Sequence, residues 1–536
     1  MMTHAAEQGG GNRLIAFFWR NTADTLAERT RRRVTLYLIP FLFFLYILAY
    51  LDRVNVSVAG LDMAKSPADG GVGFSEYTIG FGFGIFFWGY WILEIPSTVT
   101  VVRWGARWVF VRILVLWGIC AALAGSIGTP FAAWLFSWLP TLSEHTAFGN
   151  WFDGLVHLGV FSGTAGFING LHDAPENQFY VFRFMLGFFE GGFFPSVIVY
   201  LGLWFRPEDR AKAIAAFMAA IPLANVLGQP LSSLILGVQW LGLAGWRWVF
   251  ILEGLAPIVA GFATLFFLPD RPARASWLTG EERNWLEAEL DREHKRKQGH
   301  GPGAWVHHLG LVLLLTAVYF CLNATSYGLG AFMPKIFLQQ LGLEAKQSYG
   351  ILTGSQIAGL AASPVYILAL IGMLLNGRHS DHTGERVWHV AVPLTLWSVG
   401  LFLAAAFAQT PLVPLLILTL VVGTFMYAHL PAFWPIPTMF LGATAAAAAI
   451  GFINMIGNLG GSAGPWLFGW ILDRTHSLAL AILSVAAWPV VGAAIILIVG
   501  YTRRRLPAPS GATALQRNDV AVGKADDPPA PVPSQN

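Results

Sequence analysis

The sequence is poor in charged residues, which make up only 12% of its 536 positions. A soluble protein carries about 25% charged residues, because it must cover a large surface that faces water. Hydrophobic residues account for 55% of the chain. The shortage of charge therefore excludes a string of soluble domains, although the length would allow several. It predicts an all-α polytopic membrane protein.

Residues that build disulfide frameworks or metal sites are also scarce. The chain has two cysteines, Cys120 and Cys321, and both lie inside apolar runs. They predict neither a disulfide framework nor a metal site. His429 alone does not make a metal site, and no H-E-x-x-H pattern or similar set of paired ligands appears. We therefore expect no metal, no cofactor, no nucleic-acid partner and no enzymatic activity.

Long apolar runs are abundant. A spanning helix needs about 20 mainly apolar residues, and Gly and Pro are tolerated inside such helices. The runs that meet this requirement lie near 34–60, 74–99, 108–128, 179–204, 212–237, 247–268, 305–330, 349–376, 387–409, 411–435, 444–471 and 478–501. The sequence therefore predicts twelve spans, with boundaries good to a few residues.

Basic residues are distributed unevenly between alternate loops. Lys and Arg gather at 29–33, 103–107, 206–212, 378–386 and 503–505, whereas residues 113–182 contain none. Because cytoplasmic loops carry the excess of Lys and Arg, both termini are expected in the cytoplasm. The first apolar run lacks a convincing cleavage site, so it is expected to be a retained span and not a signal peptide.

Composition divides the chain into five parts. These are a cytoplasmic N-terminal segment (1–33), a six-helix bundle (34–268), a charge-rich cytoplasmic linker (269–304), a second six-helix bundle (305–502) and a disordered cytoplasmic tail (503–536). Within the first bundle, 129–177 is expected to be an extracytoplasmic insertion, either a lid or a decoration. In the linker, Thr279 and Glu282 fit a capping box. The linker helix is either solvated or docked.

The strongest local motif is "GRHSDHTGER" at 377–386, of the form G-x-x-x-D-x-x-G-x-R. Its glycines allow a tight turn, and Asp381 can cap a helix or pair with Arg386. The sequence resembles the major facilitator superfamily here, whose signature loop has this pattern. The related loop of the first half, "TVTVVRWGAR" at 98–107, has Val102 where the superfamily has Asp. We therefore expect the full charge relay in the second half only.

Longer stretches resemble the anion:cation symporter family of that superfamily. They include "YLDRVNVSVA", "RFMLGFFEGGFFPSVIVYLGLWFRPEDRAKAIAAFMAAIPLANVLGQPLS", "GWRWVFILEGLAP", "LPDRPARASWLTGEER" and "GFINMIGNLGGSAGPWLFGW". The insertion at 129–177 and the tails fall outside the resemblance. The family implies twelve transmembrane helices in two six-helix bundles, with alternating access around a central site.

Several charged residues interrupt the predicted spans, where each charge is costly and points to function. Asp52 and Arg53 are adjacent, so their side chains point about 100° apart on a helix. They either line a polar cavity or sit at the helix end near water. Arg183 and Glu190 are seven residues apart, which places both on one helix face, about 10 Å apart. They are either a functional or a purely structural pair.

The resemblance implies a role for each of these residues. Arg53 would bind the substrate anion, with its planar fork suited to a carboxylate. Asp52 and Glu190 would carry protons, and Arg183 would take part in this proton coupling. Tyr50, Tyr90, Asn454 and Asn458 would line the substrate site, although each could equally be a packing residue. Gly377, Asp381, Gly384 and Arg386 would form the cytoplasmic gate. Glu94, Glu253 and His429 are further intramembrane candidates, and Glu253 is expected in a structural pair.

The expected activity is proton-coupled uptake of a small organic acid anion across the cytoplasmic membrane of a bacterium. The carboxylate could belong to a sugar acid, a tartrate-like diacid or an aromatic acid. The expected partners are this anion, protons and the lipid bilayer, and the chain is expected to be a monomer. The alternatives are an exporter or facilitator on the same fold and a non-transporting membrane sensor.

Overall fold

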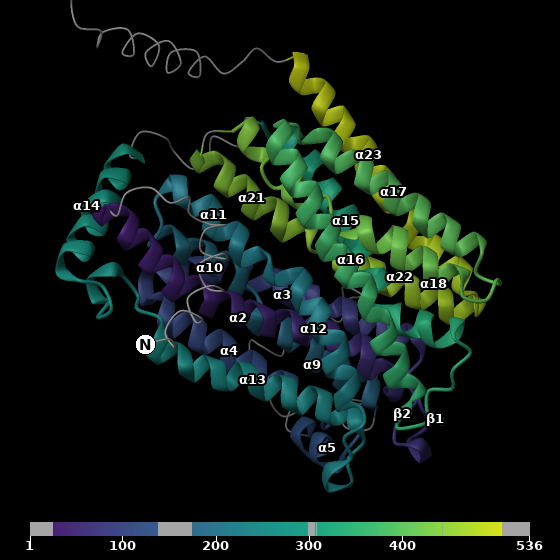
Figure 1. Cartoon of the computed structure of the whole chain (residues 1–536). Helices are drawn as coiled ribbons and strands as arrows, with labels where there is room; N and C mark the ends of the chain where they lie inside the picture. The colour runs from purple at the N-terminus through teal and green to yellow at the C-terminus, as the bar shows by residue number, and fades with distance from the viewer. Residues whose placement is uncertain (1–24, 138–173, 298–305, 307, 442, 506–536) are drawn as a thin grey trace, which may run out of the picture.

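The protein is built almost entirely of helices that pack as two side-by-side groups (Figure 1). This is a computed structural model, and it describes residues 25–137, 174–297, 306, 308–441 and 443–505. Most of the predicted insertion (138–173) and the tail from 506 lie outside the described residues. One group runs from purple to teal in Figure 1 and the other from green to yellow.

The first group contains the helices that precede the linker. They are α2 (Leu26–Met63), α3 (Glu76–Trp104), α4 (Ala106–Ala124), α5 (Pro130–Phe136), α9 (Pro175–Glu190), α10 (Phe193–Gly202), α11 (Pro207–Met218), α12 (Ala220–Ile235) and α13 (Gly245–Phe267). Three short 3-10 turns, Pro67–Asp69, Trp240–Gly242 and Pro272–Arg274, lie in the connections. The helix α14 (Gly280–Lys297) follows as the linker.

The second group contains the helices that follow the linker. They are α15 (Leu309–Gln340), α16 (Gly354–Thr383), α17 (Val387–Ala406), α18 (Val413–Ile417), the π-helix Leu418–Gly423, α19 (Thr424–Met426), α20 (Leu430–Phe433), the 3-10 turn Pro437–Met439, α21 (Ala443–Gly457), α22 (Gly460–Thr475) and α23 (Leu478–Arg505). A small antiparallel pair, β1 (Ser348–Tyr349) and β2 (Leu352–Thr353), joins α15 to α16, with Ser348 opposite Thr353.

The predicted fold of two six-helix bundles is confirmed. Ten helical segments of the described chain are long and apolar enough to cross a membrane. Two further segments complete the twelve: α3, and α21 with α22. These two segments pack against each other at the boundary between the halves.

Close backbone contact joins α3 to α9 inside the first half. A Cβ atom on Gly187 would lie 1.9 Å from the carbonyl oxygen of Phe86, and one on Gly191 would lie 2.5 Å from that of Tyr90. Small residues let membrane helices approach in this way. At Gly192 the chain adopts a left-handed φ of +89° and turns from α9 into α10. This approach brings Glu190, the last residue of α9, next to Tyr90 on α3.

Glycine also lets the two halves meet along α3 and α22. A Cβ on Gly80 would lie 2.3 Å from the carbonyl oxygen of Pro465, and one on Gly84 would lie 2.7 Å from that of Ser462. The Trp88 indole N–H donates to Ser462 Oγ at 3.0 Å in the same interface. The halves therefore touch at backbone distance along α3.

The linker helix docks on the first half. Glu282 is fully buried, and its Oε2 accepts from Arg33 at 2.6 Å at the start of α2. The predicted capping box is confirmed, since Thr279 N–H donates to Glu282 Oε2 at 2.9 Å and Glu282 N–H donates to Thr279 Oγ1 at 3.3 Å. The Trp277 ring stacks on Tyr37 at 4.3 Å. Of the alternatives left open by the sequence, these contacts favour a docked helix.

Candidate substrate and proton site

Arg53 and Glu190 form a buried ion pair between α2 and the end of α9. The Nε and Nη2 atoms of Arg53 donate to the same oxygen, Glu190 Oε1, at 2.8 and 2.5 Å. The arginine is 4% exposed and the glutamate 0%. The other carboxylate oxygen, Oε2, has no hydrogen-bond partner among the described residues. The pair thus satisfies one oxygen of Glu190 and leaves the other open.

Aromatic rings surround the guanidinium of Arg53. Its carbon lies 4.8 Å from the ring centre of Tyr50, 4.9 Å from that of Tyr90 and 5.4 Å from that of Phe86. Cation–π attraction to desolvated rings supports a buried positive charge. The aromatic rings therefore hold Arg53 in place without occupying its N–H donors.

Asp52 points away from Arg53, as their adjacent places on a helix require. Its Oδ2 accepts from the indole N–H of Trp117 on α4 at 2.5 Å, and its Oδ1 accepts from Asn55 at 3.3 Å. Sequence reasoning missed Trp117. The available signal was a tryptophan inside an apolar span, since a buried indole N–H needs an acceptor.

Arg183 is not the direct partner of Glu190. The sequence placed both on one face of a helix, about 10 Å apart, as a functional or a structural pair. Instead, Arg183 donates from Nη1 to the backbone oxygen of Asp52 at 3.2 Å and from Nε to that of Gly82 at 3.3 Å. Seven residues along one face leave the two groups nearly two turns apart, while Arg53 reaches Glu190 from the neighbouring helix. Arg183 ties α9 to α2 and α3.

A cavity of about 20 Å³, with room for about one water molecule, lies against Arg53 between the two halves. All five residues predicted to bind substrate line it: Arg53, Tyr50, Tyr90, Asn454 and Asn458. The other lining residues are Tyr46, Phe194, Met218, Ile221, Tyr319 and Trp434. The cavity is therefore aromatic, with one cation and two amides.

Both asparagines of the cavity have partners inside the protein. The amide of Asn454 donates to Glu94 Oε1, on α3 of the other half, at 2.5 Å. Asn458 Oδ1 accepts from Asn323 on α15 at 3.3 Å. Glu94 is 3% exposed, and its second oxygen has no hydrogen-bond partner among the described residues. The two asparagines, one turn apart, thus contact different halves.

The other intramembrane candidates lie outside the cavity lining. Glu253 accepts from Ser232 Oγ at 2.7 Å within the first half, which is the structural pair expected from the sequence. His429 is buried and stacks on Trp397 with ring centres 6.0 Å apart. In the part of the chain that the structure describes, no group of three or more His, Cys, Asp or Glu residues could hold a metal ion.

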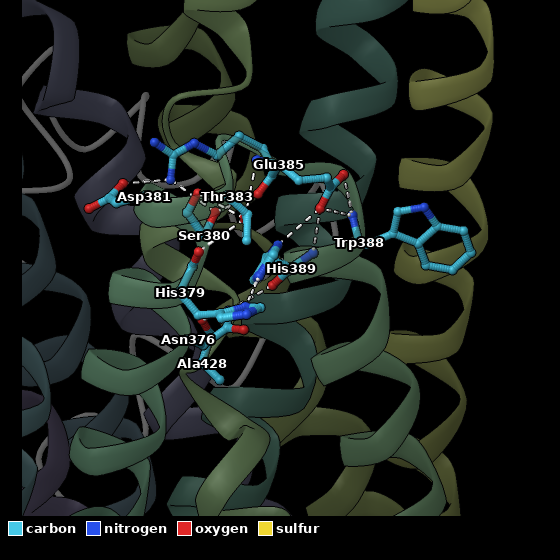
Figure 2. Close-up of polar contacts among 10 residues, drawn as sticks. Asn376, His379, Ser380, Asp381, Thr383, Glu385, Trp388, His389 and Ala428 are labelled. Atoms are coloured by element: carbon cyan, nitrogen blue, oxygen red, sulfur yellow. Dashed lines mark hydrogen bonds and ion pairs between the residues drawn. The ribbon is translucent and has the colours of Figure 1, made fainter.

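The motif loop joins α16 to α17 through the ion pair that the sequence suggested (Figure 2). Arg386 Nη1 lies 2.7 Å from Asp381 Oδ1 and 2.9 Å from Ser380 Oγ. Gly384 ends α16 with a left-handed φ of +69°. A Cβ on Gly377 would lie 3.0 Å from Pro431, where α16 meets α20. The Gly, Asp and Arg residues of the motif pattern thus each have a geometric reason in this chain.

Glu385 extends this loop into a chain of titratable groups (Figure 2). Its carboxylate accepts from the backbone N–H of Trp388 at 2.9 Å and contacts His389 Nδ1 at 2.9 Å. The other ring nitrogen of His389 lies 2.6 Å from His379 Nδ1. Asp381 therefore does not cap α17; Glu385 does.

The corresponding loop of the first half recruits a carboxylate from elsewhere in the chain. Gly105 has a left-handed φ of +91°, and a Cβ there would lie 2.7 Å from Asp270 Oδ1. The backbone N–H of Arg107 donates to the same oxygen at 3.0 Å. Asp270, which follows α13, thus provides at this helix start the carboxylate that Val102 cannot. Sequence reasoning missed it because it lies 168 positions away from the loop's Val102.

Two six-helix bundles enclosing a cavity with buried charges define a membrane transporter. A model described as the Major Facilitator Superfamily matches residues 154–465. The chain belongs to the Major Facilitator Superfamily, so the family resemblance read from the loop motif is confirmed. Proteins of this family are transporters and not enzymes.

Curated relatives cover nearly the whole chain. A protein of Agrobacterium vitis named "Putative tartrate transporter" is 37% identical over 494 residues, which span 91% of this chain and 95% of the relative. The "Inner membrane transport protein RhmT" of Escherichia coli K12 is 30% identical over 90% of this chain and 96% of its own. The "Quinolone resistance transporter" of Acinetobacter baumannii is 31% identical over 84% of this chain and 89% of its own length. These relatives are consistent with the anion:cation symporter family.

Solved structures agree on the fold. A bacterial homologue of the human lysosomal transporter Spinster superposes with a TM-score of 0.64 at 16% identity, covering 89% of this chain and 99% of its own. The D-xylose–proton symporter superposes with a TM-score of 0.56 at 17% identity, covering 88% and 97%. At these identities the likeness extends to the architecture alone.

Proposed function

We propose that this protein takes up a small organic acid anion together with protons across the inner membrane. The observation that carries the proposal is the Arg53–Glu190 pair at the wall of the cavity. Arg53 is a ready binding group for a carboxylate, and Glu190 occupies it in this structure. A substrate carboxylate and an ionised Glu190 therefore compete for one cation.

Proton coupling follows from the cost of buried charge. When Glu190 is protonated, its hold on Arg53 weakens, because the negative charge that attracts the guanidinium is lost. Arg53 would then be a buried cation without a counter-ion, which is strongly unfavourable. An anion from the substrate restores the pairing. Proton binding and anion binding thus favour each other, as symport requires, with Asp52 proposed as a neighbouring proton site.

The arrangement of contacts between the halves supports alternating access. At one end of the molecule, Lys335 pairs with Glu76 at 2.7 Å, Lys346 lies 3.5 Å from Asp69, and Ser355 donates to Asp62 at 2.6 Å. The asymmetry of Lys and Arg supports an outside location for this end and a cytoplasmic location for both termini. The proposed domains are therefore the bundles 34–268 and 305–502, with these contacts closing the outer end between them. Gly377, Asp381, Gly384 and Arg386 would gate the cytoplasmic end.

The substrate class rests on the relatives together with the cavity. Two relatives carry tartrate in their names, each 37% identical to this chain. A site lined by one arginine, two amides and several phenols suits a short hydroxylated acid. Ile221 supplies an apolar wall in the same cavity. L-tartrate is accordingly the first substrate to test.

The experiment is uptake of L-tartrate into proteoliposomes with and without an inward proton gradient. Symport predicts accumulation only with the gradient, and Arg53→Ala is expected to abolish uptake in both conditions. Uptake of equal extent without the gradient would contradict symport and indicate a facilitator. The second candidate is an exporter, favoured by the relative named for quinolone resistance. Accumulation driven by the opposite gradient would identify it.

A further inference from the structure

Two carboxylates of the first half hold hydrogen-bond donors that line the cavity. Glu190 holds Arg53, and Glu94 holds the amide of Asn454 at 2.5 Å across the boundary between the halves. Both Arg53 and Asn454 line the cavity. In each carboxylate, one oxygen accepts the hydrogen bond and the other has no partner among the described residues. Glu190 and Glu94 therefore each hold a cavity residue through one carboxylate oxygen.

We infer that Glu94 is a second proton-binding carboxylate of the transport cycle, which releases Asn454 to a second carboxylate of the substrate. The inference rests on the proposed symport and extends it to a residue on α3 and to dicarboxylates. One acid group of the substrate would replace Glu190 at Arg53, and the other would replace Glu94 at Asn454.

The charged surroundings of Glu94 favour such an exchange. Tyr90 lies one turn earlier on α3 and Ser97 nearly one turn later, where Arg112 of α4 contacts Ser97 at 3.4 Å. From α2 and α9, Arg53 and Glu190 face the same stretch of α3. Among the described residues of the second half, the neutral Asn454 is the direct hydrogen-bond partner of Glu94. A dianion that entered beside two ionised glutamates would meet strong repulsion, and two protons remove it.

A purely structural lock between α3 and α21 is the competing explanation. In that case the hydrogen bond between Glu94 and Asn454 stabilises the contact between the helices, and Glu94 does not bind a proton during transport. Glu94→Gln separates the two, because the amide oxygen of glutamine still accepts from Asn454 but cannot titrate. The number of protons taken up per bound L-tartrate is the discriminating readout. It follows from calorimetric titrations in buffers of different ionisation enthalpy.

The experiment compares wild type, Glu94→Gln and the control Asp473→Asn, a carboxylate at the far end of α22. We expect Glu94→Gln to take up one proton fewer per bound L-tartrate than wild type. This difference equals a tenfold weaker change in the Kd of L-tartrate per pH unit. The control should take up the same number of protons as wild type. An unchanged number in a folded Glu94→Gln protein would overturn the inference. Absence of L-tartrate binding to wild type would instead refute the proposed substrate.

A second variant covers the case in which Glu94→Gln does not fold. Asn454→Ala removes the group that Glu94 holds, so L-tartrate should again bind with one proton fewer. Glycerate, which has a single carboxylate, should bind wild type and Asn454→Ala with equal proton numbers. A loss of one proton for both ligands would contradict the assignment of Asn454 to the second carboxylate.

Discussion

The indole of Trp117 donates to the carboxylate of Asp52 at 2.5 Å, from α4 to the middle of α2. Both side chains are fully buried. A buried carboxylate is costly unless hydrogen bonds compensate it, and tryptophan can only donate. The contact therefore explains how α2 holds an acid next to Arg53 without directing it at the cavity.

Trp117→Phe is expected to destabilise the protein by about 1–3 kcal/mol, because it leaves the Asp52 carboxylate with a weak partner in a buried place. Thermal unfolding in detergent measures the effect. A double-mutant cycle with Asp52→Asn should give a coupling energy of at least about 0.5 kcal/mol. Additive effects of the two changes would show that the contact does not contribute.

Arg183→Lys is expected to lower stability by roughly 1–3 kcal/mol while changing anion affinity little. The guanidinium donates to the backbone oxygens of Asp52 and Gly82 at once. A lysine cannot reproduce that fork. Thermal unfolding and L-tartrate titration on the same sample separate the two effects. Lost affinity in a variant of normal stability would instead place Arg183 in the binding site.

Reversal of one charge in the Glu76–Lys335 pair should slow uptake. Lys335 Nζ and Glu76 Oε1 lie 2.7 Å apart and join the two halves at the end that is expected to face outside. Lys335→Glu replaces attraction by repulsion and should favour the state that is open at that end. A shift of about 1–2 kcal/mol in this equilibrium should lower the uptake rate about 5–30-fold. The charge swap Glu76→Lys with Lys335→Glu should restore most of the uptake. No recovery in the swapped protein would show that the pair does not act as a closure.

Glu385 predicts a stability that depends on acid pH. Burial raises the pKa of its carboxyl, but the N–H groups of Trp388 and His389 and the His389 ring outweigh this effect and hold the pKa below its ordinary 4.5. A depressed pKa stabilises the folded state above the unfolded value, and this contribution is lost as pH falls through the folded value.

The contribution of Glu385 should be modest, because its side chain is 37% exposed and salt screens its charge. For a carboxylate at a helix start we expect about 0.3–1 kcal/mol at low salt. Melting temperatures measured from pH 7 down to pH 3 should therefore fall less steeply for Glu385→Gln than for wild type. Parallel curves would exclude this role of the carboxylate.

Much of the fold could be read from the sequence, because apolar length and loop charge are local signals. The placement of Arg53 on the cavity also follows from local features, together with the family resemblance. Its pairing with Glu190 did not, since 137 positions separate the two residues. Sequence spacing favoured Arg183 as the partner, because spacing within one helix is visible and contact between helices is not. Asp270 and Trp117 were missed for the same reason.

The most direct test of the account is the pH dependence of L-tartrate affinity in wild type and Glu190→Gln. If Glu190 and the substrate compete for Arg53, wild-type affinity should rise as pH falls. Glu190→Gln should bind more tightly than wild type at pH 8 and with one proton fewer per substrate. An affinity in Glu190→Gln that is weaker at pH 8 and keeps the wild-type pH dependence would contradict the competition on which the proposed mechanism depends.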